Sequence, residues 1–307
     1  MKCHTFAALA ATMTLLAAVA CATAVEEPGR DARPLAGRIW DTKAQRFIDA
    51  EEALHAVHTA RIVLLGETHD NARHHALQLR VLQAMVAAGR RPALVMEQLD
   101  REHQAALDAE RARPGRTVDS VLDAARFDRR GWKAEGYRDL VAFALEHGLP
   151  IVAANISRAE ARALVRAPAS AHLPPVDARV EQELARDIES GHCGERIEPA
   201  LSAGMVAAQR ARDVAMAQAL TAGAQADGAV LIAGIGHVRA DRGVPLYLST
   251  RPLIVGFVEV DAAKDAPDPL DAVFATPASF DFAWFTEPAP RDDPCAGFRV
   301  RRQKGAE

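Results

Sequence analysis

The stretch RIVLLGETHD, residues 61–70, decides the fold of this chain more clearly than any other part of the sequence. Four apolar residues stop abruptly at Gly66, and Glu67 and His69 follow almost at once. A short apolar run that ends in glycine and polar residues is typical of a buried parallel strand. Residues just beyond such a strand lie where α/β proteins build their sites. An ordinary polar turn would have the same sequence, so one such stretch does not establish a site.

Three later apolar runs end in the same manner. They cover residues 92–98, 151–155 and 230–233, and they lead into Glu97, Asn155 and the sequence GIGH that ends at His237. Two more strands are predicted at 253–260 and, at an edge of the sheet, 280–285, and 38–40 with 46–48 could form a short hairpin. Helical spacing predicts helices at 50–60, from Asp70 or Asn71 to Gly89, and at 101–113, 118–125, 132–147, 158–166, 178–190 and 198–220. This alternation predicts an α/β fold: a mostly parallel sheet flanked by helices on both faces, with a ligand site at the C-terminal ends of the strands.

Length and charge narrow the class of protein. A chain of 307 residues suits one large globular domain or two small ones, and we expect residues 38–298 to form a single domain. The 37 basic and 41 acidic side chains give a formal charge of −4, so nothing indicates a nucleic-acid partner. Only two tyrosines occur, Tyr137 and Tyr247, and any role that requires a tyrosine therefore has two candidates.

The first residues have the pattern of an export signal. Lys2 precedes an apolar run over residues 6–20, which is too short for a stable membrane span. The sequence AVAC offers a lipobox, so that residues 1–20 would be removed and Cys21 lipidated; ATA at 22–24 offers cleavage after residue 24 instead. We expect a lipoprotein that is anchored to a bacterial membrane and faces the periplasm or the cell surface. Residues 21–37 would then be a tether, and residues 299–307 a basic tail.

Export would also place the chain in an oxidising compartment. If Cys21 carries lipid, Cys193 and Cys295 remain, and we predict that they form a disulfide. Two buried free thiols are the competing interpretation.

The polar residues at the strand ends should meet at one edge of the sheet. These residues are Glu67, His69, Glu97, Asn155 and His237, and Arg210, Asp213 and Arg239 could reach the same rim. Two histidines with a carboxylate can bind a metal, and a carboxylate beside a water molecule can act as a general base. A histidine and an arginine beside an apolar cleft could instead hold a carboxylate-bearing ligand such as haem.

Simpler interpretations compete with these roles. We expect His74, His75 and His103 to be solvated helix residues, and His192 to be exposed in a glycine loop. Arg210 and Asp213 are three residues apart on a helix and could pair with each other. The strand-end residues could also form polar networks only, in a scaffold without catalytic activity.

Seven motifs in order resemble one known family. They are LLGETHDN, VMEQ, W-x4-Y with Trp132 and Tyr137, LPIVAANISR, MVAAQRARDVAMA, GIGHVRADRGVPLYL and DPCAGF. Together, from about residue 61 to residue 298, they resemble the ChaN-like haem-binding uptake lipoproteins of the Tiki superfamily. The resemblance implies an exported α/β lipoprotein of iron acquisition that holds haem at the interface of a homodimer.

The resemblance also suggests roles for particular residues. Tyrosine can ligate the haem iron in such proteins, which makes Tyr137 or Tyr247 the candidate ligand, while histidine and a basic residue hold the propionates. The haem-binding set would therefore be drawn from Glu67, His69, Glu97, Tyr137, Asn155, Arg210, His237, Arg239 and Tyr247. The superfamily also contains metal-dependent hydrolases with paired G-x-x-H motifs. In that alternative His69, His237 and Glu67 would bind zinc or manganese, and Glu67 or Glu97 would be the catalytic base.

Overall fold

A single sheet with β3 near its middle organises the computed structural model, which describes residues 35–132, 135–224, 227–260, 279–293 and 295–296. Within these residues the sheet has eight strands in the order β2-β1-β8-β7-β3-β6-β4-β5. The predicted export signal, Cys21, most of the predicted tether and the basic tail lie outside the described residues. Among the described residues, no helix is long and apolar enough to cross a membrane.

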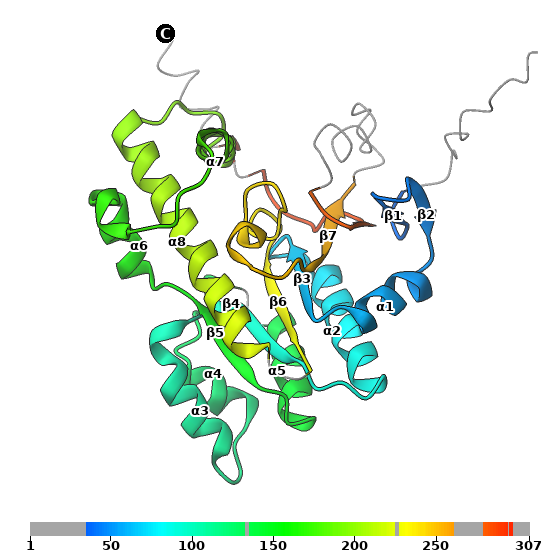
Figure 1. Ribbon diagram of the computed structural model, residues 1–307. Helices are drawn as coiled ribbons and strands as arrows, with labels where there is room; N and C mark the ends of the chain where they lie inside the picture. Colours follow the sequence, from blue (N-terminus) through cyan, green and yellow to red (C-terminus); the bar gives the residue numbers. More distant parts are fainter. Residues whose placement is uncertain (1–34, 133–134, 225–226, 261–278, 294, 297–307) are drawn as a thin grey trace, which may run out of the picture. The chain divides into compact units, whose positions relative to one another are not determined.

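The strands have the polarity that the sequence predicts. Their bounds are β1 Ile39–Asp41, β2 Arg46–Ile48, β3 Ile62–Glu67, β4 Ala93–Asp100, β5 Ile151–Asn155, β6 Ala229–Gly234, β7 Leu253–Glu259 and β8 Phe282–Thr286. The six strands from β8 to β5 run parallel to their neighbours, and β1 and β2 add an antiparallel hairpin at one end of the sheet (Figure 1). The predicted fold class and the hairpin are confirmed.

Two strands differ from the sequence prediction. β8 is not an edge strand, because β1 pairs with it on the side opposite β7. β4 continues to Asp100, and its register against β5 shifts between Met96 and Asp100. Such an irregularity turns side chains at a strand end in new directions, and Glu97 lies within it.

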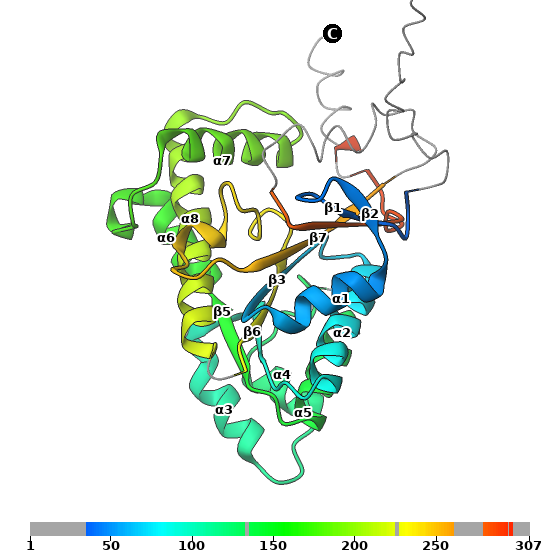
Figure 2. The ribbon, with the colours of Figure 1, turned by 45° about the vertical axis from the view of Figure 1, so that its right-hand side comes forward.

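Helices cover both faces of this sheet (Figure 2). Their bounds are α1 Ala50–Thr59, α2 Ala72–Ala87, η1 Arg101–His103, α3 Gln104–Ala112, α4 Val118–Ala124, α5 Glu135–Glu146, α6 Arg158–Arg166, η2 Pro168–Ala171, α7 Ala178–Gly191, α8 Pro199–Gly223 and η3 Val244–Tyr247. Asn71 caps α2, accepting hydrogen bonds from two backbone amides, and Thr117 and Ser120 form a capping box on α4.

Alternate residues of β3 pack on opposite sides of the sheet. Val63 and Leu65 contact a core that α1, α2, α4 and α5 supply, whereas Leu64 contacts a second core that α8 supplies. Burying both faces removes a large apolar area from water, and this explains why the central strands are continuously apolar. It also means that Glu67 emerges on the α2 and α5 side, since residues two apart share a face.

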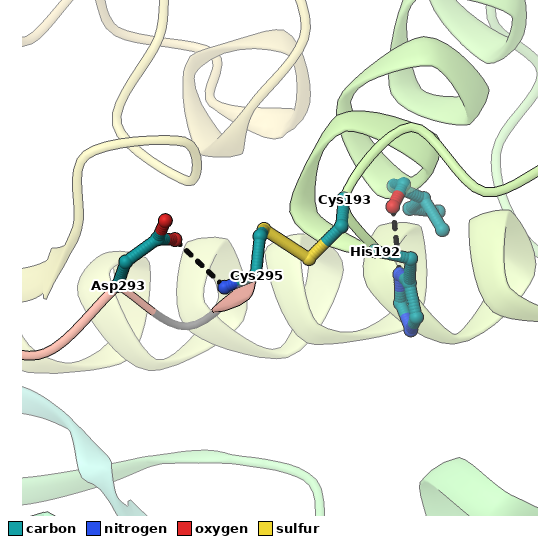
Figure 3. Close-up of a disulfide and its surroundings, with 5 residues drawn as sticks. His192, Cys193, Asp293 and Cys295 are labelled. Carbon is teal, nitrogen blue, oxygen red and sulfur yellow. Dashed lines mark hydrogen bonds between the residues drawn. A yellow bond between two sulfur atoms is a disulfide. The ribbon is translucent and has the colours of Figure 1, made fainter. Parts of the chain in front are cut away.

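Cys193 and Cys295 form a disulfide with a Cα–Cα distance of 5.6 Å, and this confirms the predicted pairing. Cys193 lies in the turn after α7, and the backbone amide of Cys295 donates to Asp293 Oδ1 at 2.8 Å (Figure 3). The bond joins the segment that follows β8 to the connection between α7 and α8. Residues 102 positions apart are thereby held together.

We predict that this disulfide contributes about 4 kcal/mol to the free energy of unfolding, because it closes a loop of roughly a hundred residues in the unfolded chain. Cys193→Ser should lower the melting temperature by about 10 °C in a calorimetric scan. Cys295→Ser and the double variant should lower it by the same amount, and a reductant should then have no further effect on any of the three. Alkylation of both thiols in unreduced wild-type protein, detected by intact mass, would contradict the pairing.

Candidate functional site

The ends of four neighbouring parallel strands meet at the candidate site. β3 pairs with β6 so that Glu67 lies opposite Gly234, and β4 and β5 follow on the other side of β6. The two G-x-x-H sequences therefore leave the sheet side by side. As predicted, Glu67, His69, Glu97, Asn155 and His237 come together at one edge of the sheet.

Glu67 is the most enclosed of these residues, with 1% of its surface exposed. Its two carboxylate oxygens are contacted by five side chains from three elements and one loop. Tyr137 donates its hydroxyl to Oε1, His69 Nδ1 lies 2.9 Å from Oε1, Gln98 Nε2 donates to Oε1 at 3.1 Å, Gln78 Nε2 donates to Oε2 at 2.7 Å, and His75 Nε2 lies 3.3 Å from Oε2.

The charges of this cluster are set by its contacts. Burial alone would raise the pKa of the Glu67 carboxyl, but His69 and His75 hold that pKa at about 2. Burial opposes protonation of His69, yet the Glu67 and Glu97 carboxylates raise the pKa of its imidazole to about 9. Burial and the Glu67 charge raise the pKa of the Tyr137 phenol far above its usual value. Glu67 is therefore a carboxylate that holds a cationic His69.

A second pair of histidine and carboxylate lies on the α8 side of the sheet. His237 Nδ1 is 2.6 Å from Asp213 Oδ1, and its Nε2 is 3.4 Å from Glu97 Oε1. Burial raises the pKa of Asp213 to about 6, although His237 opposes this effect. Burial also opposes protonation of His237, but the Glu97 and Asp213 carboxylates raise its pKa. Gln209 lies 3.2 Å from the same imidazole.

Gly234 is the point where the two pairs approach each other. A methyl group on its Cα would lie 2.9 Å from His69 Nε2 and 3.7 Å from Glu97 Oε2, and its backbone amide donates to Glu97 Oε2 at 2.7 Å. Beside it opens a cavity of about 520 Å³ that Glu97, His237 and Trp132 help to line. Trp132 also packs edge to face against the His69 ring, with 4.7 Å between centroids.

Two other predicted residues do not contact the two histidine–carboxylate pairs through their side chains. Asn155 helps to position the backbone of Glu97, because its side-chain amide donates to the Glu97 carbonyl. Its side-chain oxygen accepts a hydrogen bond from Arg212. Arg239 forms a two-bond ion pair with Asp241 and takes no part in the cluster.

The expected pairing of Arg210 with Asp213 is wrong. The two residues have different partners. Arg210 donates to Glu181 Oε1 at 2.5 Å, to the Pro174 carbonyl and to the Tyr247 hydroxyl at 3.2 Å, whereas Asp213 contacts His237.

The structure also corrects two of the expected solvated histidines. His74 and His75 are buried, because they lie on the core-facing side of α2 with Leu77. His74 accepts from the Thr68 amide and contacts the Thr286 hydroxyl at 2.8 Å. Burial lowers the pKa of His74 to about 4. His103 is partly exposed, and His192 is exposed as predicted.

The two tyrosines have very different surroundings. Tyr137 has no exposed surface, and its hydroxyl is committed to Glu67. Its complete burial and the commitment of its hydroxyl to Glu67 argue against a role as an iron ligand. Tyr247 is half-buried at the end of η3 and lines a surface pocket of about 660 Å³.

The metal-binding alternative does not fit this geometry. Within the described part of the chain, one group of three potential ligands has its atoms within 4.8 Å of one another, and it is Asp100, Glu102 and His103. Glu67 cannot serve as proposed, because hydrogen-bond donors already occupy both of its oxygens. A protonated His69 would also have to lose its proton before it could bind a metal.

Sequence analysis missed the polar residues that surround Glu67. Gln78 and His75 lie one turn from the apolar residues of α2, so helical spacing alone predicts that they face the core. Gln98 follows Glu97, and strand alternation places it on the opposite face, toward Glu67. Arg212 gave no comparable signal, because a charged residue on a long helix is usually solvated.

Comparison with known proteins gives a family and a fold. A family model described as haem-binding uptake, Tiki superfamily, ChaN matches residues 53–248. The solved structure of ChaN of Campylobacter jejuni, with cofacial haem binding, has a TM-score of 0.64 and 22% identity over 80% of this chain and 95% of that chain. No curated protein matches.

Two further solved structures are less similar. The type III effector HopBA1 has a TM-score of 0.43 and 14% identity, over 77% of this chain and 92% of its own. A mutant of erythromycin esterase EreC has a TM-score of 0.42 and 13% identity, over 82% of each chain. Likeness at this level carries no argument about function, and the likeness to ChaN of Campylobacter jejuni supports the fold alone.

The shifted pKa values of His69 and His74 predict two opposite contributions to the pH dependence of stability. The pKa of His69 is raised, so its stabilising effect is complete below pH 6.5 and is lost as the pH rises toward 9. The pKa of His74 is lowered, so stability falls by about 3 kcal/mol as the pH drops from 6.5 to below 4. Urea unfolding of the wild type and of each variant between pH 4 and 9 measures these contributions as free energies of unfolding. Relative to the wild type, His69→Gln should reduce the loss of stability between pH 6.5 and 9, and His74→Gln should reduce the loss below pH 6.5. A pH dependence identical to that of the wild type would contradict the assignment for that histidine.

Proposed function

The chain belongs to the ChaN-like family of haem-binding uptake proteins in the Tiki superfamily, and from this membership we propose that it binds haem in the service of haem or iron uptake. The proposal needs residues that suit the iron, the porphyrin and the propionates. The region around Tyr247 supplies candidates for all three.

The pairing of Arg210 with Tyr247 carries the proposal. Arg210 Nε donates to the Tyr247 hydroxyl at 3.2 Å, and 7% of the surface of Arg210 is exposed. Burial raises the pKa of the Tyr247 phenol above its ordinary value, and the hydrogen bond and the charge of Arg210 only partly oppose this effect. A guanidinium that donates to a phenol stabilises the phenolate, and phenolate oxygen is a ligand of haem iron.

The surroundings of this pair fit a flat apolar ligand. Leu246 and Leu248 line the same pocket as Tyr247, together with Pro174 from the segment between η2 and α7. Leu246 is 41% exposed, which is unusual for a large apolar side chain in the described residues. A bound porphyrin would cover such a surface and remove it from water.

A neighbouring cavity offers partners for carboxylates. It has a volume of about 870 Å³, lies between α7 and α8, and is lined by Arg196 and His172 as well as by Arg210. Glu181 and Glu189 line it too, and Arg210 pairs with Glu181, so a propionate would have to compete with that carboxylate. Arg210 lines this cavity and contacts Tyr247, which lines the other pocket. In a haem complex Tyr247 would hold the iron and the basic side chains would hold the propionates, while the haem itself would supply the ferric centre.

The cellular setting is part of the same proposal. The signal-like residues 1–20 and the lipobox support an exported protein tethered to a bacterial membrane through Cys21 and facing the periplasm or the cell surface. The exposed apolar surface at Leu246 supports a homodimer on haem binding, because a second copy would cover the outer face of the ligand. The geometry does not favour the metal-dependent alternative, because side-chain contacts already engage both carboxylate oxygens of Glu67.

We predict that haemin will bind with a saturable shift of the Soret band. Tyr247→Phe should abolish the charge-transfer spectrum of a phenolate ligand and weaken binding at least about tenfold, because the iron loses its ligand. Tyr137→Phe is the matched control: it removes the other tyrosine hydroxyl and should leave the haem spectrum unchanged. Titrations at fixed pH, with thermal melts to check folding, provide the measurement. The absence of a saturable shift would contradict haem binding, and a lost spectrum in Tyr137→Phe alone would contradict the choice of ligand.

A further inference from the structure

The strand-end cavity beside Gly234, of about 520 Å³, carries charges of both signs, and the proposed haem region does not use it. Acidic lining residues come from the end of β4 and the turn that follows it, and they are Glu97, Asp100 and Glu102. Basic lining residues come from three other segments, the turn after α4, the start of α6 and the middle of α8, and they are Arg126, Arg158 and Arg212. A ligand in this cavity would therefore meet partners of both charges.

Two of these three guanidinium groups have no carboxylate partner in the described part of the chain. Arg158 pairs with Asp128, which also lines the cavity, at 2.7 Å between Nη2 and Oδ2. Arg126 and Arg212 take part in no ion pair among the described residues, and Arg212 Nη1 instead donates to Asn155 Oδ1 at 2.6 Å. The charges of Arg126 and Arg212 therefore remain available to an anionic group of a ligand.

The first turn of α6 adds backbone donors to this basic side of the cavity. Ser157 caps the helix, because its hydroxyl accepts from the Glu160 amide at 3.3 Å, and Ser157, Arg158 and Ala159 all line the cavity. The amides at the start of a helix have no partner inside the helix, and the positive end of the helix dipole attracts carboxylates. A carboxylate is the anionic group that this combination of guanidinium and amide donors suits.

The acidic side of the cavity has acceptors without donors. Asp100 takes part in no ion pair among the described residues, and burial and the charge of Glu102 raise the pKa of its carboxyl, although Arg212 opposes this effect. Gln98 is 3% exposed, and its Nε2 donates to Glu67, but its Oε1 is buried without a hydrogen-bond partner in the described residues. A buried acceptor of this kind is costly unless a donor reaches it. An ammonium group has three donors and no acceptor, and it would serve both residues.

The short distance between the two sides indicates which ligand carries both groups. Asp100 lies opposite Asn155 on the neighbouring strand, strands are about 4.8 Å apart, and α6 begins three residues after Asn155. Ammonium and carboxylate must therefore be close together in the ligand, as they are in an α-amino acid. Trp132 adds an aromatic surface to the lining, and its ring packs against His69 with 4.7 Å between centroids. A cavity of about 520 Å³ lies in the usual range for small ligands.

We propose that the strand-end cavity binds a free α-amino acid with an apolar side chain. Its carboxylate binds Arg126, Arg212 and the first turn of α6. Its ammonium group binds Asp100 and the side-chain oxygen of Gln98, and its side chain packs on Trp132.

Isothermal titration calorimetry on the full-length protein without haemin tests this proposal with three probes of one shape. L-Phenylalanine carries both charged groups, 3-phenylpropionate lacks the ammonium group, and phenethylamine lacks the carboxylate. We expect L-phenylalanine to bind saturably, with a dissociation constant at least about tenfold lower than that of either other probe, because each missing group forfeits charge-assisted hydrogen bonds.

Three variants then assign the two ends of the ligand. Arg126→Gln and Arg212→Gln should each weaken L-phenylalanine binding at least about fivefold without weakening that of phenethylamine. Asp100→Asn should weaken L-phenylalanine binding to a similar extent without weakening that of 3-phenylpropionate. Circular dichroism and a thermal melt show whether each variant is folded. Arg126 is exposed, so Arg126→Gln keeps the test valid if Arg212→Gln does not fold.

Matched controls make the same substitutions on neighbouring helix surfaces. Arg162 on α6 and Asp139 on α5 are exposed and do not line the cavity, so Arg162→Gln and Asp139→Asn should bind L-phenylalanine as the wild type does. The absence of saturable L-phenylalanine binding would overturn the proposal, as would equal affinities for L-phenylalanine and 3-phenylpropionate. Equal affinities of the cavity variants and the controls for L-phenylalanine would also overturn it.

Discussion

A buried negative charge at the end of β3 is the constraint on which the rest of the structure depends. Glu67 sits at the junction of the sheet with α2 and α5, and an unpaired carboxylate there would cost several kcal/mol. Its two oxygens are satisfied only if Gln78 of α2, Tyr137 of α5 and Gln98 of β4 all arrive together. The buried carboxylate therefore requires α2, α5 and β4 to pack around Glu67. The same carboxylate also contacts His69 and orients its imidazole.

The sequence predicted the sheet and the convergence of the strand ends well, because both follow from local patterns. Apolar runs that stop at Glu67, Glu97 and Asn155 place those residues at a common edge once the strands are parallel. The position of β8 could not be predicted in this way. It depends on a pairing with β1, which lies more than two hundred residues earlier in the chain.

The errors at individual residues share one physical reason. The prediction that His74 and His75 are solvated is wrong, because the core-facing side of α2 extends into its first turn and buries both rings. The sequence leaves both tyrosines as possible iron ligands, because composition carries no information on how deeply a residue is buried. Burial separates them, since Tyr137 lies in the core and Tyr247 at the surface.

The two G-x-x-H motifs depend on each other sterically, because β3 and β6 lie side by side. A methyl group on Gly66 of the first motif would come within 2.3 Å of Val238, the residue that follows the second motif's histidine. A methyl group on Gly234 of the second motif would come within 2.9 Å of His69, the histidine of the first. Each glycine thus makes room for a side chain that the other motif brings in. Because the strands are in register, with Glu67 opposite Gly234, this reciprocal fit requires glycine at both positions and brings the two histidines to the same edge of the sheet.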